Sequence, residues 1–261
     1  MKKDRIFDGL SQRFQRKIYS NDDPRGAIRL HIIQDDIRTQ SFLDQRLHVL
    51  DAGAGMGQMS CWLAQQGHTI VLAEPSQEML EVAKQNIQET LGQHSSLITP
   101  KQDTIQSLCD DTLHQHFDFI VCHAVLEWLA SPLENLAQLL NTLKPGGWLS
   151  LMFFNRHSKV MRHLVGGDLK PVLENRIASD GHNGLAPISP LVPDDVANWL
   201  IDSGLEVITW SGVRCFYDYS HPEVRKRIDL QDVLTLERRF SQQEPWRSLA
   251  RYQHMLCYKP T

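Results

Sequence analysis

LHVLDAGAGMG, at residues 47–57, is the stretch of sequence that decides the fold. It opens with a short apolar run of strand length, and after Asp51 three glycines follow at every second position. Glycine adopts positive φ readily and lets a ligand approach the backbone closely. A loop of this kind at the end of a parallel strand places a ligand at the edge of the sheet. The stretch therefore predicts a first strand followed by a ligand-binding turn.

The segments that follow alternate between strand and helix patterns. Strands are predicted at 69–73, 97–99, 117–122 and 148–154, and helices at 58–66, 77–91 and 133–143, with a turn at 144–147. Residues 117–122 are almost continuously apolar, as a strand buried on both faces requires. The alternation predicts an α/β fold with a doubly wound, Rossmann-like, mostly parallel sheet and helices on both faces.

The alternation stops after residue 154. Residues 156–193 have no clear strand pattern and contain several Gly and Pro, which indicates an insertion or a lid. Further along, we predict a helix at 193–201, strands at 206–217 and 249–258, and a charged helix at about 221–240. One late strand is expected to be antiparallel. We expect one domain over 1–261, with an N-terminal helical extension at 1–45.

Composition excludes several classes of protein. The chain has 261 residues, of which 41% are hydrophobic and 22% charged, and its formal net charge is −4. No apolar run approaches the roughly 20 residues that span a membrane, and the N-terminus leads into no apolar signal region. Five scattered cysteines without a CxxC pair favour reduced thiols in a cytosolic protein. The histidines form no metal pattern, and we expect the pair in His114-Gln115-His116 to lie in a loop.

The glycine spacing and two acidic residues indicate the kind of ligand. The G-x-G-x-G spacing of residues 53–57 is tighter than the G-x-G-x-x-G of dinucleotide sites, which disfavours a nicotinamide dehydrogenase. Glu74 ends the second strand about 20 residues after the loop, where an acid can accept hydrogen bonds from two ribose hydroxyls. Asp103, with Gln102 beside it, could hold an adenine amino group. The alternatives are a structural turn at the loop and solvated surface acids at both other places.

These motifs together resemble the class I methyltransferase family. The resemblance covers roughly residues 45–155 and rests on 50–57, Glu74, Asp103, 117–122 (FDFIVC) and 143–147 (LKPGG). It implies a seven-stranded sheet and S-adenosylmethionine as the cofactor.

A narrower resemblance extends over nearly the whole chain, to the family of bacterial tRNA 5-carboxymethoxyuridine methyltransferases. It rests on Phe14 to Tyr19, 25–29 (RGAIR), 123–128 (HAVLEW), 149–155 (LSLMFFN) and 212–219 (GVRCFYDY). That family methylates the carboxylate of a modified wobble uridine, giving the methyl ester, so the implied partner is the tRNA anticodon stem-loop. The resemblance implies a cofactor site made of Arg29, Gly53, Ala54, Gly55, Glu74, Gln102, Asp103 and His123. Ala54 and Met56 depart from the glycine-rich, acidic loop expected in the family, and we expect neither to abolish binding.

Methylation of a carboxylate agrees with the residues present, because a carboxylate is already ionised at neutral pH and needs no general base. The sequence accordingly shows no compelling base or nucleophile dyad, and we name no catalytic residue. Candidate substrate-binding residues are Arg214, Trp128 and Tyr217, although Trp128 could equally be a core residue.

RNA binding requires a basic surface, and residues 156–261 have a net charge of +1 against −5 for residues 1–155. Candidate RNA contacts are Arg156, Lys159, Arg162, Arg214, Arg225, Lys226, Arg227, Arg238 and Arg239. Two alternatives stay open: a methyltransferase acting on a small molecule, such as a quinone or a carboxylic acid, and a non-catalytic module that binds the cofactor or RNA.

Overall fold

The computed structural model describes residues 3–9, 24–108, 113–179 and 186–261. The stretch Phe14 to Tyr19, which carried part of the narrower resemblance, and Cys109 lie outside the described residues.

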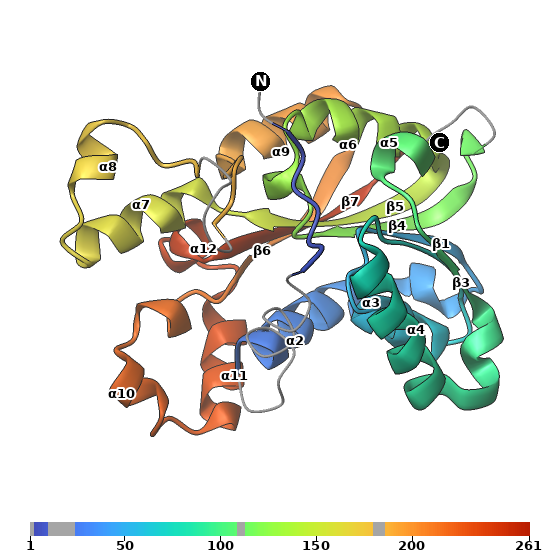
Figure 1. The fold of residues 1–261 in the computed structure, drawn as a ribbon, viewed down its shortest axis with the longest axis horizontal. Helices are drawn as coiled ribbons and strands as arrows, with labels where there is room; N and C mark the ends of the chain where they lie inside the picture. Colours follow the sequence, from blue (N-terminus) through green and yellow to red (C-terminus); the bar gives the residue numbers. More distant parts are fainter. Residues whose placement is uncertain (1–2, 10–23, 109–112, 180–185) are drawn as a thin grey trace.

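A seven-stranded sheet forms the centre of the molecule (Figure 1), in the order β3-β2-β1-β4-β5-β7-β6. Its strands are β1 (His48–Ala52), β2 (Thr69–Ala73), β3 (Ile98–Lys101), β4 (Phe117–His123), β5 (Leu143–Phe154), β6 (Glu206–Val213) and β7 (Tyr252–Tyr258). β1 to β5 run parallel, and β7 runs antiparallel to both of its neighbours. The predicted fold class and the late antiparallel strand are confirmed. The order reverses between β1 and β4, which is where doubly wound sheets bind ligands.

Helices cover both faces of the sheet (Figure 1). One face carries α2 (Pro24–Arg38), α3 (Gln58–Ala64), α4 (Gln77–Leu91) and α11 (Leu230–Phe240), and the other carries α5 (Ile105–Leu108), α6 (Pro132–Asn141) and α9 (Pro193–Asp202). Side chains alternate across each strand, so β4 places Phe119 and Val121 in the first core and Ile120 and Cys122 in the second.

Several boundaries differ from those predicted. The predicted turn at 144–147 lies inside β5, which pairs with β4 through an irregular register near Phe117. The predicted strand at 206–217 ends at Val213, because Arg214 has a left-handed φ of +64°. The charged helix at 221–240 is two helices, α10 (Pro222–Arg225) and α11, because the Asp229 side chain caps a new helix by accepting from the amides of residues 231 and 232.

The region predicted as an insertion contains helices that the sequence pattern did not indicate. They are α7 (Arg156–Val165) and α8 (Lys170–Leu173). Asn155 caps α7 by accepting from the His157 amide at 2.8 Å. α7 has apolar residues at helical spacing, Val160, Met161, Leu164 and Val165, but the Gly and Pro residues of this region led to the prediction of an insertion.

Short helical turns complete the chain: η2 (Ser41–Asp44), η3 (Gly92–Leu97), η5 (Leu126–Trp128), η6 (Tyr217–Tyr219) and α12 (Trp246–Leu249). Over the residues that the structure describes, none of the helices is both long and apolar enough to cross a membrane.

Candidate functional site

The glycine-rich loop connects β1 to α3 and is fixed against the end of β2. The amides of Gly53 and Ala54 donate to the Ala73 carbonyl at 2.8 and 3.0 Å. Gly53 has a φ of +69°, and a Cβ at this position would lie 2.4 Å from Val125 Cγ2. Glycine is therefore required at residue 53 by its backbone conformation and by its neighbour.

Glu74 follows β2 directly and supports the loop from the opposite side. Its Oε2 accepts the Gly55 amide at 2.9 Å, and its Oε1 accepts the Ser76 amide at 3.0 Å. Burial raises the pKa of this carboxyl, and the two amides offset part of that rise. A carboxylate has about four acceptor positions, so two remain for a ligand in the pocket that Glu74 lines. Two neighbouring acceptors match the vicinal hydroxyls of a ribose.

The pocket lies at the carboxyl ends of the central parallel strands, and its walls are mostly apolar. The apolar wall residues are Ile6, Phe7, Ala73, Pro75, Met79, Ile105, Ala124, Val125, Trp128 and Leu129. The polar groups include Arg29, Glu74, Asp103 and His123. An apolar pocket with a few polar groups at defined places is typical of a small-molecule site.

Residues 3–9 form one wall of this pocket, and Figure 1 shows them in dark blue crossing the sheet edge. Asp4 holds the segment in place, because its carboxylate accepts the Ala130 amide at 2.7 Å and the Gln106 side-chain amide at 2.8 Å. The Phe7 ring meets the Trp128 ring edge-on at 4.9 Å. Residues 3–7 have no regular secondary structure and residues 8–9 form a turn, so this part of the N-terminal region is not helical as predicted.

A small cavity adjoins the main pocket and shares Arg29, Gly53 and His123 with it. Arg29 extends from α2 and donates to Gln58 Oε1 at 2.5 Å. His123 ends β4, and its Nε2 lies 2.8 Å from Ser150 Oγ. Burial lowers the pKa of His123 well below its ordinary value, so the ring is neutral. Its Nδ1 is buried and has no hydrogen-bond partner among the described residues.

Asp51 lines the same small cavity and links β1 to α3. Its Oδ2 accepts the Ser60 hydroxyl at 2.6 Å. Burial raises the pKa of this carboxyl to about 6, and the Ser60 bond opposes the shift.

The structure brings together most of the residues predicted to hold a cofactor. Those that line the two adjoining cavities are Arg29, Gly53, Ala54, Gly55, Glu74, Asp103 and His123. Gln102 is placed differently: its exposed side chain turns away and its amide lies 3.4 Å from the Pro75 carbonyl.

The three predicted substrate-binding residues are not brought together. Trp128 is buried in the wall of the main pocket. Arg214 is buried in an ion pair, with its Nε 2.7 Å from Asp218 Oδ2. Tyr217 is buried in the core, and the Arg225 guanidinium lies 5.6 Å from its ring centre. Arg214 and Tyr217 are not among the wall residues of the main pocket.

Sequence reasoning missed the apolar walls of the pocket. Ile105 begins α5 two residues after Asp103, so its closeness to Asp103 in the sequence was an available signal. Phe7 gave no signal, because nothing local in the sequence relates residues 3–9 to a loop more than 100 residues away.

A second cavity, between α7 and the start of β7, carries an excess of positive charge. Its walls are Phe154, Lys159, Arg162, His163, Asp168, Ala186, Pro187 and Arg251. The Arg251 guanidinium lies 4.5 Å from the Phe154 ring centre, and its buried Nε meets no acceptor in the described part of the chain. Burial lowers the pKa of Arg251 to about 10, which leaves it charged at neutral pH. Asp168, the acid in these walls, is paired with His163 at 2.9 Å.

Metal chemistry finds no support in the described ranges. No group of three or more His, Cys, Asp or Glu that could hold a metal ion occurs within 3–9, 24–108, 113–179 and 186–261. Cys61, Cys122, Cys215 and Cys257 are buried free thiols.

A Rossmann-like sheet with a buried acid after β2 and a glycine loop at its switch point is typical of one class of protein: a domain that binds a nucleoside-containing cofactor. Residues 26–209 match the family model described as a methyltransferase domain, and the chain belongs to this family. Its cofactor is S-adenosylmethionine. The apolar walls and Glu74 suit the adenosine part of that molecule. The His123 Nδ1, which has no partner among the described residues, suits its amino-acid part.

Individual proteins similar to this chain are more specific than the family model. The chain is 35% identical over 262 residues to the tRNA 5-carboxymethoxyuridine methyltransferase of Escherichia coli (strain K12), covering 98% of this chain and 97% of that protein. It is 27% identical to the ubiquinone biosynthesis O-methyltransferase of Coxiella burnetii (strain CbuG_Q212), covering 80% of this chain and 83% of that protein. The solved structure of magnesium protoporphyrin IX methyltransferase from Synechocystis matches with a TM-score of 0.64 at 16% identity, covering 97% and 96%.

Proposed function

We propose that this S-adenosylmethionine-dependent methyltransferase acts on the carboxylate of 5-carboxymethoxyuridine at the tRNA wobble position and forms the methyl ester. The observation that carries the proposal is the 35% identity to the Escherichia coli enzyme over nearly the full length of both chains. We propose Arg29, Gly53, Ala54, Gly55, Glu74, Asp103 and His123 as the residues that bind the cofactor.

The chemistry of the pocket supports a carboxylate acceptor. S-adenosylmethionine supplies a methyl group on a sulfonium, and its transfer forms an O–C bond as the S–C bond breaks. A carboxylate is ionised at neutral pH, so no proton has to be removed. His123 is a weak base because burial lowers its pKa, and both Glu74 oxygens already accept backbone amides. The walls therefore contribute positioning, which can itself lower the barrier by several kcal/mol.

The basic second cavity supports a polyanionic substrate. Lys159, Arg162 and Arg251 face a space in which the one acid is already paired. Arg214 contributes indirectly, because it pairs with the buried Asp218 carboxylate, which also interacts electrostatically with Arg251. We propose that this cavity receives an anionic group of the tRNA, since phosphate contacts dominate the affinity of proteins for nucleic acids.

Trp128 is proposed to contact the target base. Its ring forms part of the pocket wall, and aromatic rings stack on unpaired bases in single-stranded RNA. An unpaired wobble base in the anticodon loop is a substrate of this kind. Tyr217 is buried in the core, and we propose for it a supporting role beneath Arg225.

O-methylation of a quinone precursor is the second candidate function, favoured by the likeness to the ubiquinone biosynthesis enzyme. A phenolic hydroxyl has a pKa near 10 and needs a base to deprotonate it. The neutral, weakly basic His123 suits that task poorly. The positive charge of the second cavity would also not contribute to binding an uncharged quinone precursor.

The test is methylation of tRNA that carries unmethylated 5-carboxymethoxyuridine by the purified enzyme and S-adenosylmethionine. Nucleoside mass spectrometry should detect the methyl ester. Arg162→Glu, in the basic cavity, should slow its formation, whereas Lys170→Glu, the same charge change at an exposed site on α8, should not. Methylation of a quinol with no ester formed on tRNA would overturn the proposal.

A further inference from the structure

A chain of hydrogen-bonded side chains runs through the core from α2 to the cofactor pocket. Asp36 Oδ2 lies 2.8 Å from His254 Nδ1, and His254 Nε2 lies 2.8 Å from Ser150 Oγ. Ser150 Oγ lies 2.8 Å from His123 Nε2. Asp36, Ser150 and His254 are each 0% exposed, and His123 is the member of the chain that lines the pocket. These hydrogen bonds end on His123, whose Nδ1 is buried and has no partner among the described residues.

The sheet itself brings these residues together. His123 of β4 and His254 of β7 are both register partners of Met152 in the intervening strand β5. Ser150 lies two residues before Met152, so its side chain points to the same face as those two rings. Helix α2 packs on this face and supplies Asp36. Residues of three strands thus meet at the Ser150 hydroxyl, and Asp36 of α2, 218 residues away from His254 in the sequence, joins them through His254.

The order of the protons follows from the ends of the chain. A carboxylate only accepts, so His254 donates from Nδ1 to Asp36. With a single proton on that ring, His254 Nε2 accepts the hydroxyl proton of Ser150. Ser150 has no second proton, so its oxygen accepts from His123 Nε2. The proton of His123 is then on Nε2, and its Nδ1 is bare.

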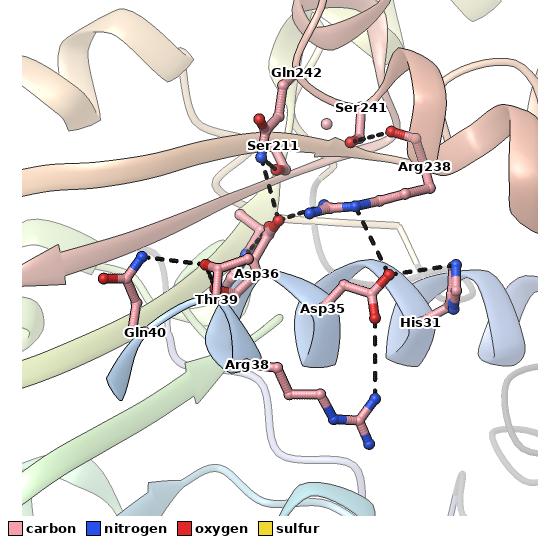
Figure 2. Close-up of polar contacts among 12 residues, drawn as sticks. His31, Asp35, Asp36, Arg38, Thr39, Gln40, Ser211, Arg238, Ser241 and Gln242 are labelled. Carbon is pink, nitrogen blue, oxygen red and sulfur yellow. Dashed lines mark hydrogen bonds and ion pairs between the residues drawn. The ribbon is translucent and has the colours of Figure 1, made fainter. Parts of the chain in front are cut away.

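Basic side chains approach the two carboxylates of α2. Figure 2 shows Arg238 of α11 reaching both carboxylates of α2, with its Nη1 2.5 Å from Asp36 Oδ1. Asp35 lies at the surface, where Arg38 approaches it to 3.9 Å. Arg238 therefore compensates the buried charge of Asp36.

We propose that Asp36, His254 and Ser150 are positioning residues that hold His123 in its Nε2-protonated tautomer, so that its bare Nδ1 offers an acceptor to the methionyl ammonium of the cofactor. The ammonium group has only donors, and Nδ1 is a buried acceptor without a partner in the described residues. Burial lowers the pKa of His123, which keeps Nδ1 unprotonated. Arg29 beside it suits the methionyl carboxylate. The inference concerns the cofactor and is independent of the methyl acceptor.

The first experiment measures the tautomer directly in the ligand-free enzyme. Long-range ¹H–¹⁵N correlation spectra of ¹⁵N-histidine-labelled protein distinguish a ring protonated at Nε2 from one protonated at Nδ1. His123→Asn assigns the signal. We expect His123 to be Nε2-protonated in the wild type and to lose this single pattern in Ser150→Ala. Protonation of His123 at Nδ1 in the wild type would overturn the proposal without any need for a folded variant.

The second experiment separates positioning from structural support by comparing two ligands. S-adenosylhomocysteine contains the amino-acid group, whereas 5′-methylthioadenosine lacks it. Ser150→Ala should weaken binding of S-adenosylhomocysteine about 10-fold and leave the affinity for 5′-methylthioadenosine unchanged. Ser158→Ala, which removes a buried hydroxyl on α7 that donates to the Asn155 carbonyl at 2.8 Å, should change neither. Equal losses for both ligands in Ser150→Ala, or no loss at all, would show that the chain does not position His123.

Discussion

Replacing Glu74 with alanine tests the central contact of the cofactor site. The change removes the acceptors of the Gly55 and Ser76 amides, at 2.9 and 3.0 Å, and two further acceptor positions that face the pocket. A hydrogen bond to a charged group contributes about 1.5–3 kcal/mol. Loss of two such bonds to the ribose should therefore weaken cofactor binding by about 3 kcal/mol, or roughly 100-fold.

The loss of loop support must be separated from the loss of the ribose contact. Isothermal titration calorimetry with S-adenosylhomocysteine and its 2′-deoxy analogue does so, because the analogue lacks one ribose hydroxyl. The wild type should bind the analogue about 10-fold more weakly, whereas Glu74→Ala should bind both ligands equally. The two changes form a cycle whose coupling energy reports the contact itself. Additive effects, with equal discrimination by both proteins, would refute the assignment of Glu74 to the ribose.

Three other perturbations give distinct outcomes. Gly55→Val should abolish cofactor binding in calorimetry, because a β-branched residue does not tolerate the φ of +58°. The loop would have to change its conformation, and the hydrogen bond from the backbone amide of residue 55 to Glu74 would be lost. Wild-type affinity would contradict the loop assignment. Burial raises the pKa of Glu127 to about 8, so the folded state retains a proton that the unfolded state loses above its ordinary pKa near 4.5, and the contribution of Glu127 to stability falls as pH rises through that window. Glu127→Gln should therefore narrow the difference in unfolding free energy between about pH 5 and about pH 8 by more than about 1 kcal/mol in urea titrations, and parallel pH profiles would count against this account. Arg162→Glu should weaken tRNA binding and flatten its salt dependence while leaving the affinity for S-adenosylhomocysteine unchanged; unaltered tRNA affinity in a filter-binding assay would remove the basic cavity from the RNA surface.

Local patterns allowed the sequence to predict much of the cofactor end of the molecule. The strands at 69–73 and the helix at 77–91 have the predicted bounds, because apolar periodicity and capping residues act within a few positions of the chain. Gly53, Glu74 and His123 could be named for a related reason: each follows a strand directly, and the ends of adjacent parallel strands meet at one edge of the sheet.

The sequence predicted the orientation of side chains only near those strand ends. Arg214 was predicted to hold the substrate, yet a left-handed backbone turns it into an ion pair with Asp218. Arg251 carried no motif, yet it lines the basic cavity. Helix α7 was missed because the Gly and Pro residues that follow it indicated an insertion, although its own sequence has apolar residues at helical spacing.

By itself the sequence determined the class of fold, the glycine loop and the acid that ends β2, because these depend on interactions within a strand, a turn and the next helix. Only the tertiary structure decided the wall formed by residues 3–9, the basic cavity, and the chain from Asp36 through His254 and Ser150 to His123. Those contacts join residues far apart in the sequence, and they arise from strand register and from the face on which α2 packs.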